Sequence, residues 1–302
     1  MDLSQTLRSI VGLSAAVPAD AFTASALGTE RTGSGVVIDD GLVLTIGYLI
    51  TEADRIWLKA ADGRLTEGHA LAIDQETGVG LVQALGRLGL PALELGEARA
   101  TRVGDAVVLA AGEAGQLVHA EILAKQEFAG YWEYLLDEAI FTAPALPLWG
   151  GAGLIGPDGR LLGIGSLLVQ HASEHGETRD ANMSVPIDLI RPILGDLTAY
   201  GRVRRPARPW LGLFCAENEG TIVVASLADR GPAAQAGIRP GDIVRAADER
   251  PVEDLADFYR AVWATGEAGV LVTLSVERDG RLLSVRIRSA DRMDFLKKPH
   301  LH

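Results

Sequence analysis

Short apolar segments, each bounded by Gly, Asp or Glu, recur between residues 9 and 169 and constrain the fold more than any other feature. They are β-branched or alternate in polarity, as half-buried strands do, and read SGVVI, LVLTIG, RIWLKAADGR, GLVQAL, DAVVLAAG and LVHAEILAK. The 35 glycines and 13 prolines supply turns, and long helical patterns are few. Such segments in succession predict a barrel or a sandwich rather than β–α–β units.

The apolar period then changes to a helical one. Ile187, Ile190, Leu194 and Leu197 follow helical spacing, Pro186 suits a first turn, and a second proline at 192 predicts a late start or a kink. The following residues 201–209 carry four arginines and two prolines without an acid. Prolines stiffen such a segment, so we interpret it as a solvated interdomain linker, with docking on an acidic surface as the alternative.

A second, smaller unit follows at residues 210–292. It contains strand-like segments TIVVASL, DIVRAAD, VLVTLSVERDG and RLLSVRIRS, and a helical segment VEDLADFYRAVWATG. A chain of 302 residues exceeds the span of one hydrophobic core, so two domains are expected. The remaining residues 293–302 are expected to form a loosely ordered tail.

Charge and cysteine content restrict the partners and the compartment. The net charge of −12 argues against nucleic acid and against an anionic membrane as the main partner. Cys215 is the single cysteine, so no disulfide within the chain supports an oxidising compartment.

The N-terminal residues 9–22 are only mildly apolar, Pro18 and Asp20 interrupt them, and ASA at residues 24–26 resembles a cleavage site. We interpret this poor signal peptide as the first strand of the domain, and expect a cytoplasmic protein.

A glycine-rich turn at residues 145–165 raises a question about catalysis. The segment reads ALPLWGGAGLIGPDGRLLGIG and lies between two apolar, strand-like stretches. Turns of this kind present nucleophiles in hydrolases, yet this one contains no Ser, Cys or Thr. The turn is therefore expected to be kept as architecture.

These segments together resemble the HtrA family of proteases. GSGVVIDDGLVLT is similar to the approach to the catalytic histidine, DQETGVGLVQ to the aspartate strand, and WGGAGLIGPDGRLLGIG to the nucleophile turn. GPAAQAGIRPGDIV resembles a PDZ domain and is the most specific piece. The resemblance covers nearly the whole chain and implies a mainly β fold, a chymotrypsin-like double β-barrel followed by a small α+β PDZ domain. It implies a protease-fold domain at 1–200, a linker at 201–209, a PDZ domain at 210–292 and a tail at 293–302.

The resemblance also locates the catalytic positions, and none of them keeps its residue. The His position holds Tyr48, the Asp position holds Gly78, and the Ser position holds Gly150. The mechanism needs a hydroxyl nucleophile, an imidazole base and a carboxylate that orients the imidazole. Tyrosine, with an ordinary pKa of about 10, is a poor base at neutral pH. A pseudoprotease is therefore expected.

The remaining histidines offer one weak alternative site. His171 and His175 are four residues apart, a spacing that some metal ligands use, but the surroundings read as a loop rather than a helix. We expect an exposed loop there, no metal and no cofactor. Cys215 is expected to be a buried, inert thiol.

The resemblance implies that the PDZ domain holds a peptide C-terminus. Its carboxylate loop is Trp210, Leu211, Gly212 and Leu213, in which the glycine lets several N–H groups converge on one anion. An apolar pocket beside the loop is expected to involve the side chains of Phe214, Phe258 and Val262, although the helical stripe that contains the last two fits a core equally well.

Three functions stay open at this level. The first is a non-catalytic adaptor that binds a peptide or protein C-terminus; the second is a hydrolase with relocated catalytic residues. The third is a structural subunit whose PDZ groove is occupied by its own tail or by a neighbour. The family forms trimers, so a homo-oligomer is compatible with each, although the N-terminus lacks the aromatic cluster expected for those contacts.

Overall fold

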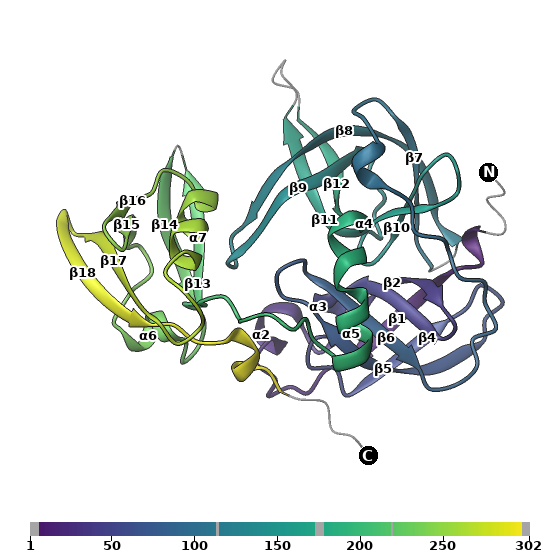
Figure 1. Ribbon diagram of the computed structural model, residues 1–302, viewed down its shortest axis with the longest axis horizontal. Coiled ribbons are helices and arrows are strands. Elements are labelled where there is room, and N and C mark those ends of the chain that lie inside the picture. The colour runs from purple at the N-terminus through teal and green to yellow at the C-terminus, as the bar shows by residue number, and fades with distance from the viewer. Residues whose placement is uncertain (1–5, 113–114, 173–177, 219, 298–302) are drawn as a thin grey trace. The chain divides into compact units, whose positions relative to one another are not determined.

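A computed structural model describes residues 6–112, 115–172, 178–218 and 220–297. The chain divides into two compact units (Figure 1). Unit 1 comprises Met1–Gln126, Asp137–Arg204 and Lys297–His302, and unit 2 comprises Glu127–Leu136 and Arg205–Leu296. Unit 2 therefore contains a short segment from the middle of the chain in addition to the C-terminal domain.

Unit 1 begins with a closed six-stranded barrel. Its strand order is β1-β2-β3-β6-β5-β4, with every pair antiparallel. The strands are β1 (Ile10–Ala16), β2 (Glu30–Asp39), β3 (Leu42–Ile46), β4 (Arg55–Lys59), β5 (Leu65–Ile73) and β6 (Val79–Ala84). The predicted first strand is confirmed: β1 lies in the barrel wall and pairs with β2 and β4.

Helix α2 (Ala24–Leu27) contains the residues that resembled a cleavage site. A cut after Ala26 would remove β1 and leave two barrel strands without their partner. The predicted cytoplasmic location stays a prediction. Among the described residues, no helix has the length and apolarity that crossing a membrane requires.

A second closed sheet of six strands completes the mainly β architecture of unit 1. Its order is β10-β11-β12-β9-β8-β7. The strands are β7 (Ala106–Ala110), β8 (Leu117–Gly130), β9 (Tyr134–Ala143), β10 (Gly153–Ile155), β11 (Leu161–Ala172) and β12 (Thr178–Pro186). Leu109, Ile122, Ile140 and Leu154 are fully buried, so alternate apolar residues of these strands form the core. The barrel prediction is therefore confirmed for residues 9–169.

The helical stretch after β12 is interrupted where proline predicted it. It consists of α4 (Ile187–Ile190), the 3-10 turn η3 (Arg191–Ile193) and α5 (Leu194–Tyr200). Pro192 lies in the 3-10 turn, because proline lacks the N–H group that a continuous α-helix needs.

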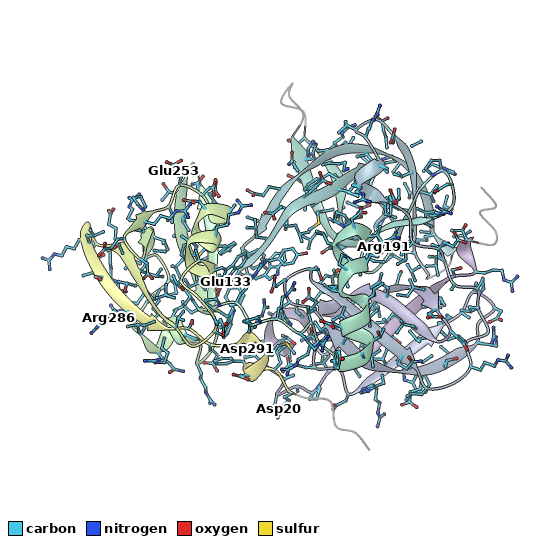
Figure 2. The ribbon with its side chains drawn as sticks, viewed as in Figure 1. Asp20, Glu133, Arg191, Glu253, Arg286 and Asp291 are labelled. Atoms are coloured by element: carbon cyan, nitrogen blue, oxygen red, sulfur yellow. The ribbon has the colours of Figure 1, made fainter. Side chains whose placement is uncertain are left out.

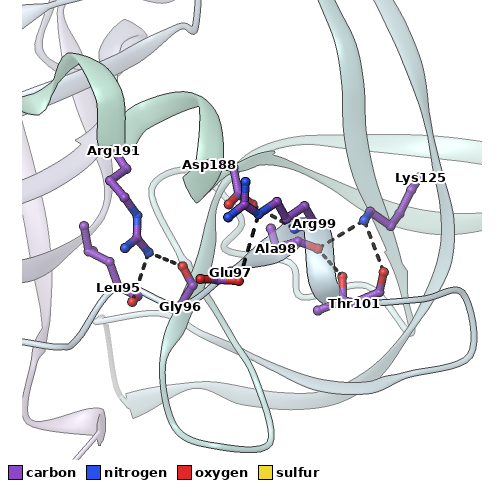
Figure 3. A network of polar contacts seen from close by, with 9 residues as sticks. All are labelled: Leu95, Gly96, Glu97, Ala98, Arg99, Thr101, Lys125, Asp188 and Arg191. Atoms are coloured by element: carbon purple, nitrogen blue, oxygen red, sulfur yellow. Dashed lines mark hydrogen bonds and ion pairs between the residues drawn. The ribbon is translucent and has the colours of Figure 1, made fainter.

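A polar network ties this helical stretch to the segment between the two barrels (Figure 3). The Arg191 guanidinium donates to the carbonyl oxygens of Leu95 and Gly96, and the Asp188 carboxylate accepts the Arg99 N–H at 2.8 Å. Lys125 donates to the carbonyls of Ala98 and Thr101 at 3.1 and 3.2 Å, around the 3-10 turn η1 (Ala98–Ala100). Carbonyl groups that no strand uses are satisfied in this way.

Unit 2 contains an antiparallel PDZ-like sheet in the order β13-β14-β15-β17-β18, with β16 paired to β15. The elements are β13 (Leu213–Asn218), β14 (Thr221–Leu227), α6 (Pro232–Gln235), β15 (Ile243–Ala247), β16 (Arg250–Pro251), α7 (Leu255–Trp263), β17 (Leu271–Arg278), β18 (Arg281–Arg288) and η4 (Arg292–Phe295). Asp254 caps α7 by accepting the Asp257 N–H at 2.7 Å. Strand β13 is the last strand on one side of the sheet, so its outer edge pairs with no other strand of this sheet.

Candidate functional site

The structure brings Tyr48 and Gly150 together in unit 1. Tyr48 lies in the short helix α3 (Gly47–Ile50), directly after β3, and its hydroxyl donates to the carbonyl oxygen of Ser166 at 2.9 Å. A Cβ atom added to Gly150 would lie 2.8 Å from the Tyr48 hydroxyl oxygen. Burial raises the pKa of Tyr48, against a smaller lowering effect of Trp149. The phenol is therefore neutral, its proton is used in the hydrogen bond to Ser166, and it cannot act as a base in the cleft.

Gly78 closes the turn between β5 and β6 and contributes only backbone. Its φ of +76° is in the left-handed region, and its carbonyl accepts the Gly47 N–H at 2.7 Å. The neighbouring carboxylate of Asp74 accepts the N–H and the hydroxyl of Thr77 at 2.9 and 2.7 Å. This carboxylate therefore stabilises the turn.

A cavity of about 190 Å³ lies beside Tyr48 and Gly150. Its lining consists of Thr32, Gly33, Ser34, Tyr48, Leu49, Pro147, Leu148, Trp149 and Gly150. Among these described residues there are hydroxyl groups and apolar side chains, but no imidazole, thiol or carboxylate. The cavity can enclose an apolar group, whereas acid–base chemistry has no titratable partner at neutral pH.

The glycine-rich turn is held in place by backbone contacts with the first barrel. The Ser34 N–H donates to the Gly150 carbonyl at 2.8 Å, and a Cβ atom on Gly151 would lie 1.9 Å from the Ser34 carbonyl oxygen. Gly151 also has a φ of +75°. The turn therefore has a structural reason to keep its glycines, independent of catalysis.

The described histidines lie apart from this cleft. His69 and His119 lie in β5 and β8, and the His171 ring in β11 is 6.0 Å from the Phe141 ring. The predicted exposed loop is therefore wrong at His171, which is half-buried in a strand, and His175 lies outside the described residues. Within the described part of the chain, no group of three His, Cys, Asp or Glu side chains has a metal-binding arrangement.

The predicted carboxylate loop of the PDZ domain holds a carboxylate. Glu133, which is labelled in Figure 2 and belongs to unit 2, accepts the N–H groups of Leu211, Gly212 and Leu213. The distances are 3.0 Å from Leu211 N to Oε2, 2.6 Å from Gly212 N to Oε1, and 2.8 Å from Leu213 N to Oε1. Gly212 has a φ of +77°, which turns successive N–H groups toward one anion. Sequence reasoning identified the loop and missed its occupant.

The other predicted peptide-binding residues are distributed differently. Phe214 is half-buried, and its ring lies 6.3 Å from the Tyr131 ring. Trp210 is buried against Phe295 and pairs with Ala290, so it anchors the start of the loop. Phe258 and Val262 are 1% and 2% exposed and belong to the PDZ core, which was the alternative interpretation of that helical stripe.

Cys215 lies in β13, fully buried, one strand position beyond Phe214. Burial, with a contribution from the charge of Glu133, raises the pKa of its thiol to about 12. The thiol is therefore neutral and unreactive, as the sequence predicted.

The comparisons with known proteins agree with this architecture. Residues 33–164 match the family described as the trypsin-like peptidase domain, and residues 209–288 match the PDZ domain. The HtrA-type protease AlgW, solved with a tripeptide, has a TM-score of 0.56 at 23% identity, over 99% of this chain and 97% of that one. A serine endoprotease from Yersinia pestis has a TM-score of 0.55 at 23% identity, over 96% and 98% of the two chains. These structures show the fold.

Curated relatives have similar sequences over both domains. The probable periplasmic serine endoprotease DegP-like of Pseudomonas fluorescens is 27% identical over 277 residues, which is 85% of this chain and 56% of the relative. The serine endoprotease DegS of Escherichia coli is 27% identical over 273 residues, 84% of this chain and 75% of DegS. The chain spans about half the length of the DegP relatives that it matches. The chain therefore resembles HtrA/DegP proteins over both domains, with a trypsin-like peptidase domain at residues 33–164 followed by a PDZ domain at residues 209–288.

Proposed function

We propose that this protein is a catalytically silent HtrA-like adaptor, in which the protease-like domain is a scaffold and the PDZ domain binds the C-terminus of a protein partner. The observation that carries the proposal is the cleft itself: Gly150 has no side chain, and the Tyr48 hydroxyl lies where a Gly150 Cβ would be crowded. A hydrolase needs a nucleophile and a base within hydrogen-bond reach of each other. The lining residues include hydroxyl groups but no imidazole or carboxylate that could activate one of them.

The similarity to serine endoproteases favours a second candidate, a serine endopeptidase with relocated catalytic residues. That candidate requires a serine beside a base. Ser34, the serine that lines the cavity, is buried and accepts the Gly112 N–H at 3.1 Å on its hydroxyl. A buried hydroxyl without a neighbouring base is a poor nucleophile, and this supports the adaptor rather than the hydrolase.

The two candidates differ in the fate of an unfolded protein substrate. We expect the purified chain to leave a fluorescently labelled, denatured protein intact, whereas an active relative assayed in parallel degrades it. A residual background that persists when each remaining serine is changed to alanine belongs to a contaminant. Degradation that disappears with one such change would instead establish the relocated hydrolase.

The PDZ part of the proposal predicts selectivity for a free carboxylate. Hydrogen bonds to a charged group contribute about 1.5–3 kcal/mol each, so amidating the C-terminus of an apolar peptide should weaken its binding to the full chain roughly tenfold or more. Gly212→Val should have a similar effect, because valine strains a backbone with a φ of +77°. A titration with matched free-acid and amidated peptides measures this difference. Equal affinities would show that the loop is not a site for external carboxylates.

We also propose a cytoplasmic location. The support is the role of β1, which pairs with β2 and β4 and would be lost by cleavage after Ala26. The protein recovered from the cytoplasmic fraction is expected to retain β1 when its N-terminus is sequenced. A mature N-terminus near Leu27 in another fraction would contradict the proposal.

A further inference from the structure

The structure assigns Glu133 as an internal ligand of the PDZ carboxylate loop, held by its own chain in place of a partner's C-terminus. The segment Glu127–Leu136, which we call the hairpin tip, contains the ends of β8 and β9 and the turn between them. It clusters with the PDZ domain in unit 2. The inference concerns the site named in the proposed function, and it does not require that any external peptide binds.

The first argument is the geometry of the carboxylate. Three consecutive N–H groups, from Leu211 to Leu213, converge on one side-chain carboxylate at 2.6–3.0 Å. Arg292 supplies a nearby positive charge and donates to the Trp132 carbonyl at 3.4 Å. A carboxyl group with three backbone donors occupies the loop in the position expected of a terminal carboxylate, so an external carboxylate cannot enter while Glu133 stays.

The second argument is the set of hydrogen bonds between the hairpin tip and the two PDZ elements β13 and α7. The Cys215 N–H in β13 donates to the Tyr131 carbonyl at 2.9 Å. On the helix side, the Tyr259 hydroxyl donates to the Gly130 carbonyl at 2.8 Å and accepts the Glu133 N–H at 3.3 Å. The hairpin tip thus makes one backbone hydrogen bond to the edge strand and two hydrogen bonds to the helix, on the two sides between which an extended peptide adds to a sheet.

The third argument is apolar packing around the carboxylate. Leu135 is 8% exposed and belongs to the PDZ core cluster, with Ala129 packed against that cluster. The Trp132 and Tyr134 rings stack at 5.4 Å, and the Tyr131 ring lies 6.3 Å from the Phe214 ring. These contacts position Glu133 against its loop, even though its φ of +57° is unfavourable for a residue with a side chain.

The test measures the protection of the loop amides in the 302-residue chain, without added peptide. Amide hydrogen exchange at Leu211–Leu213 is measured in the wild type, in Glu133→Ala and in the matched control Glu121→Ala, an exposed glutamate of β8. We expect exchange at these three amides to accelerate at least tenfold in Glu133→Ala and to stay unchanged in the control. Unchanged exchange in Glu133→Ala would overturn the inference. If that variant fails to fold, Glu133→Asp, one methylene shorter, gives the same readout with a smaller acceleration.

A second arm separates this inference from the proposed function. A free-acid peptide with an apolar last residue is titrated into the same chains, and Glu133→Ala should bind it at least tenfold more tightly than the wild type. Faster exchange without peptide binding would establish the internal ligand and overturn the adaptor proposal alone. Tight, equal binding by the wild type and the variant would overturn the internal ligand.

Discussion

A chain that carries Tyr48→His, Gly78→Asp and Gly150→Ser together is expected to hydrolyse unfolded protein no faster than the wild type. In an active serine hydrolase, loss of the triad costs on the order of a millionfold in turnover, so a functional restoration would be unmistakable. Three features of the cleft oppose it. The measurement is release of fluorescent fragments from a labelled, denatured protein, alongside an active relative.

The first obstacle is space at position 150. A Cβ on Gly150 would lie 2.8 Å from the Tyr48 hydroxyl oxygen, so Gly150→Ser alone should lower the melting temperature. Adding Tyr48→His removes that oxygen and should recover part of the loss, although it also removes the bond to the Ser166 carbonyl. The two single variants and the double variant therefore form a cycle with a measurable coupling.

The second and third obstacles concern the orienting carboxylate and the oxyanion hole. Gly78 has a φ of +76°, so an aspartate there starts from a strained backbone at a cost of about 1 kcal/mol. Leu148 and Trp149 line the cavity where small residues are expected beside oxyanion donors. Efficient hydrolysis by the triple variant would show that the donors are intact and that these obstacles are surmountable.

Protection of the PDZ loop is expected to fall as the pH rises from about 5 through 7. Burial raises the pKa of Glu133 to about 7, against the opposing effects of the Leu211, Leu213 and Gly212 N–H groups and of the Arg292 charge. Released into water, the carboxyl returns to a pKa of about 4.3. The docked hairpin tip thus binds the proton more tightly than the released one. Docking is therefore most favourable below about pH 4.3 and weakens, on the order of a hundredfold, as the pH passes through 7.

The charged and titratable groups facing Glu133 are Arg292 from η4, Cys215 from β13 and Tyr259 from α7. Burial raises the pKa of Cys215 to about 12 and also raises that of Tyr259, so neither titrates between pH 5 and 8. The measurement is the exchange rate of the Leu211–Leu213 amides at each pH, divided by the intrinsic rate at that pH. Glu133→Gln keeps an acceptor oxygen without a titratable group, and its protection should be independent of pH. A pH-independent wild type would contradict the prediction.

The strands could be predicted from the sequence because each one has a local pattern of alternating or β-branched residues. Alternating or β-branched segments bounded by glycine became β2, β3, β4, β6, β7 and β8, and Pro192 marked the 3-10 turn. The loop at 211–213 was predicted through the resemblance to PDZ domains, and Gly212 has the positive φ that such a loop uses. Each of these features is determined by residues that are close together in the sequence.

That Glu133 occupies the loop could not be predicted from a local sequence pattern, because Glu133 and Gly212 are 79 residues apart in the chain. One signal was present: residues 128–134 read FAGYWEY, an unusually aromatic turn for a solvent-exposed hairpin. Such a cluster indicates burial against another surface. The aromatic cluster does not indicate which surface buries it. The PDZ domain is identified by the packing of Leu135 into the PDZ core, which is a tertiary contact.

The most direct test of the central claim, that the protease fold is catalytically silent, is labelling with a broad fluorophosphonate probe that reacts with activated serines. The intact mass of the purified wild-type chain is measured after prolonged exposure to the probe, with an active HtrA relative as the positive control. We expect complete labelling of the relative and no mass increase in this chain, because Gly150 provides no nucleophile and the cavity lining provides no base. Stoichiometric addition to one serine, abolished when that serine is changed to alanine, would contradict it.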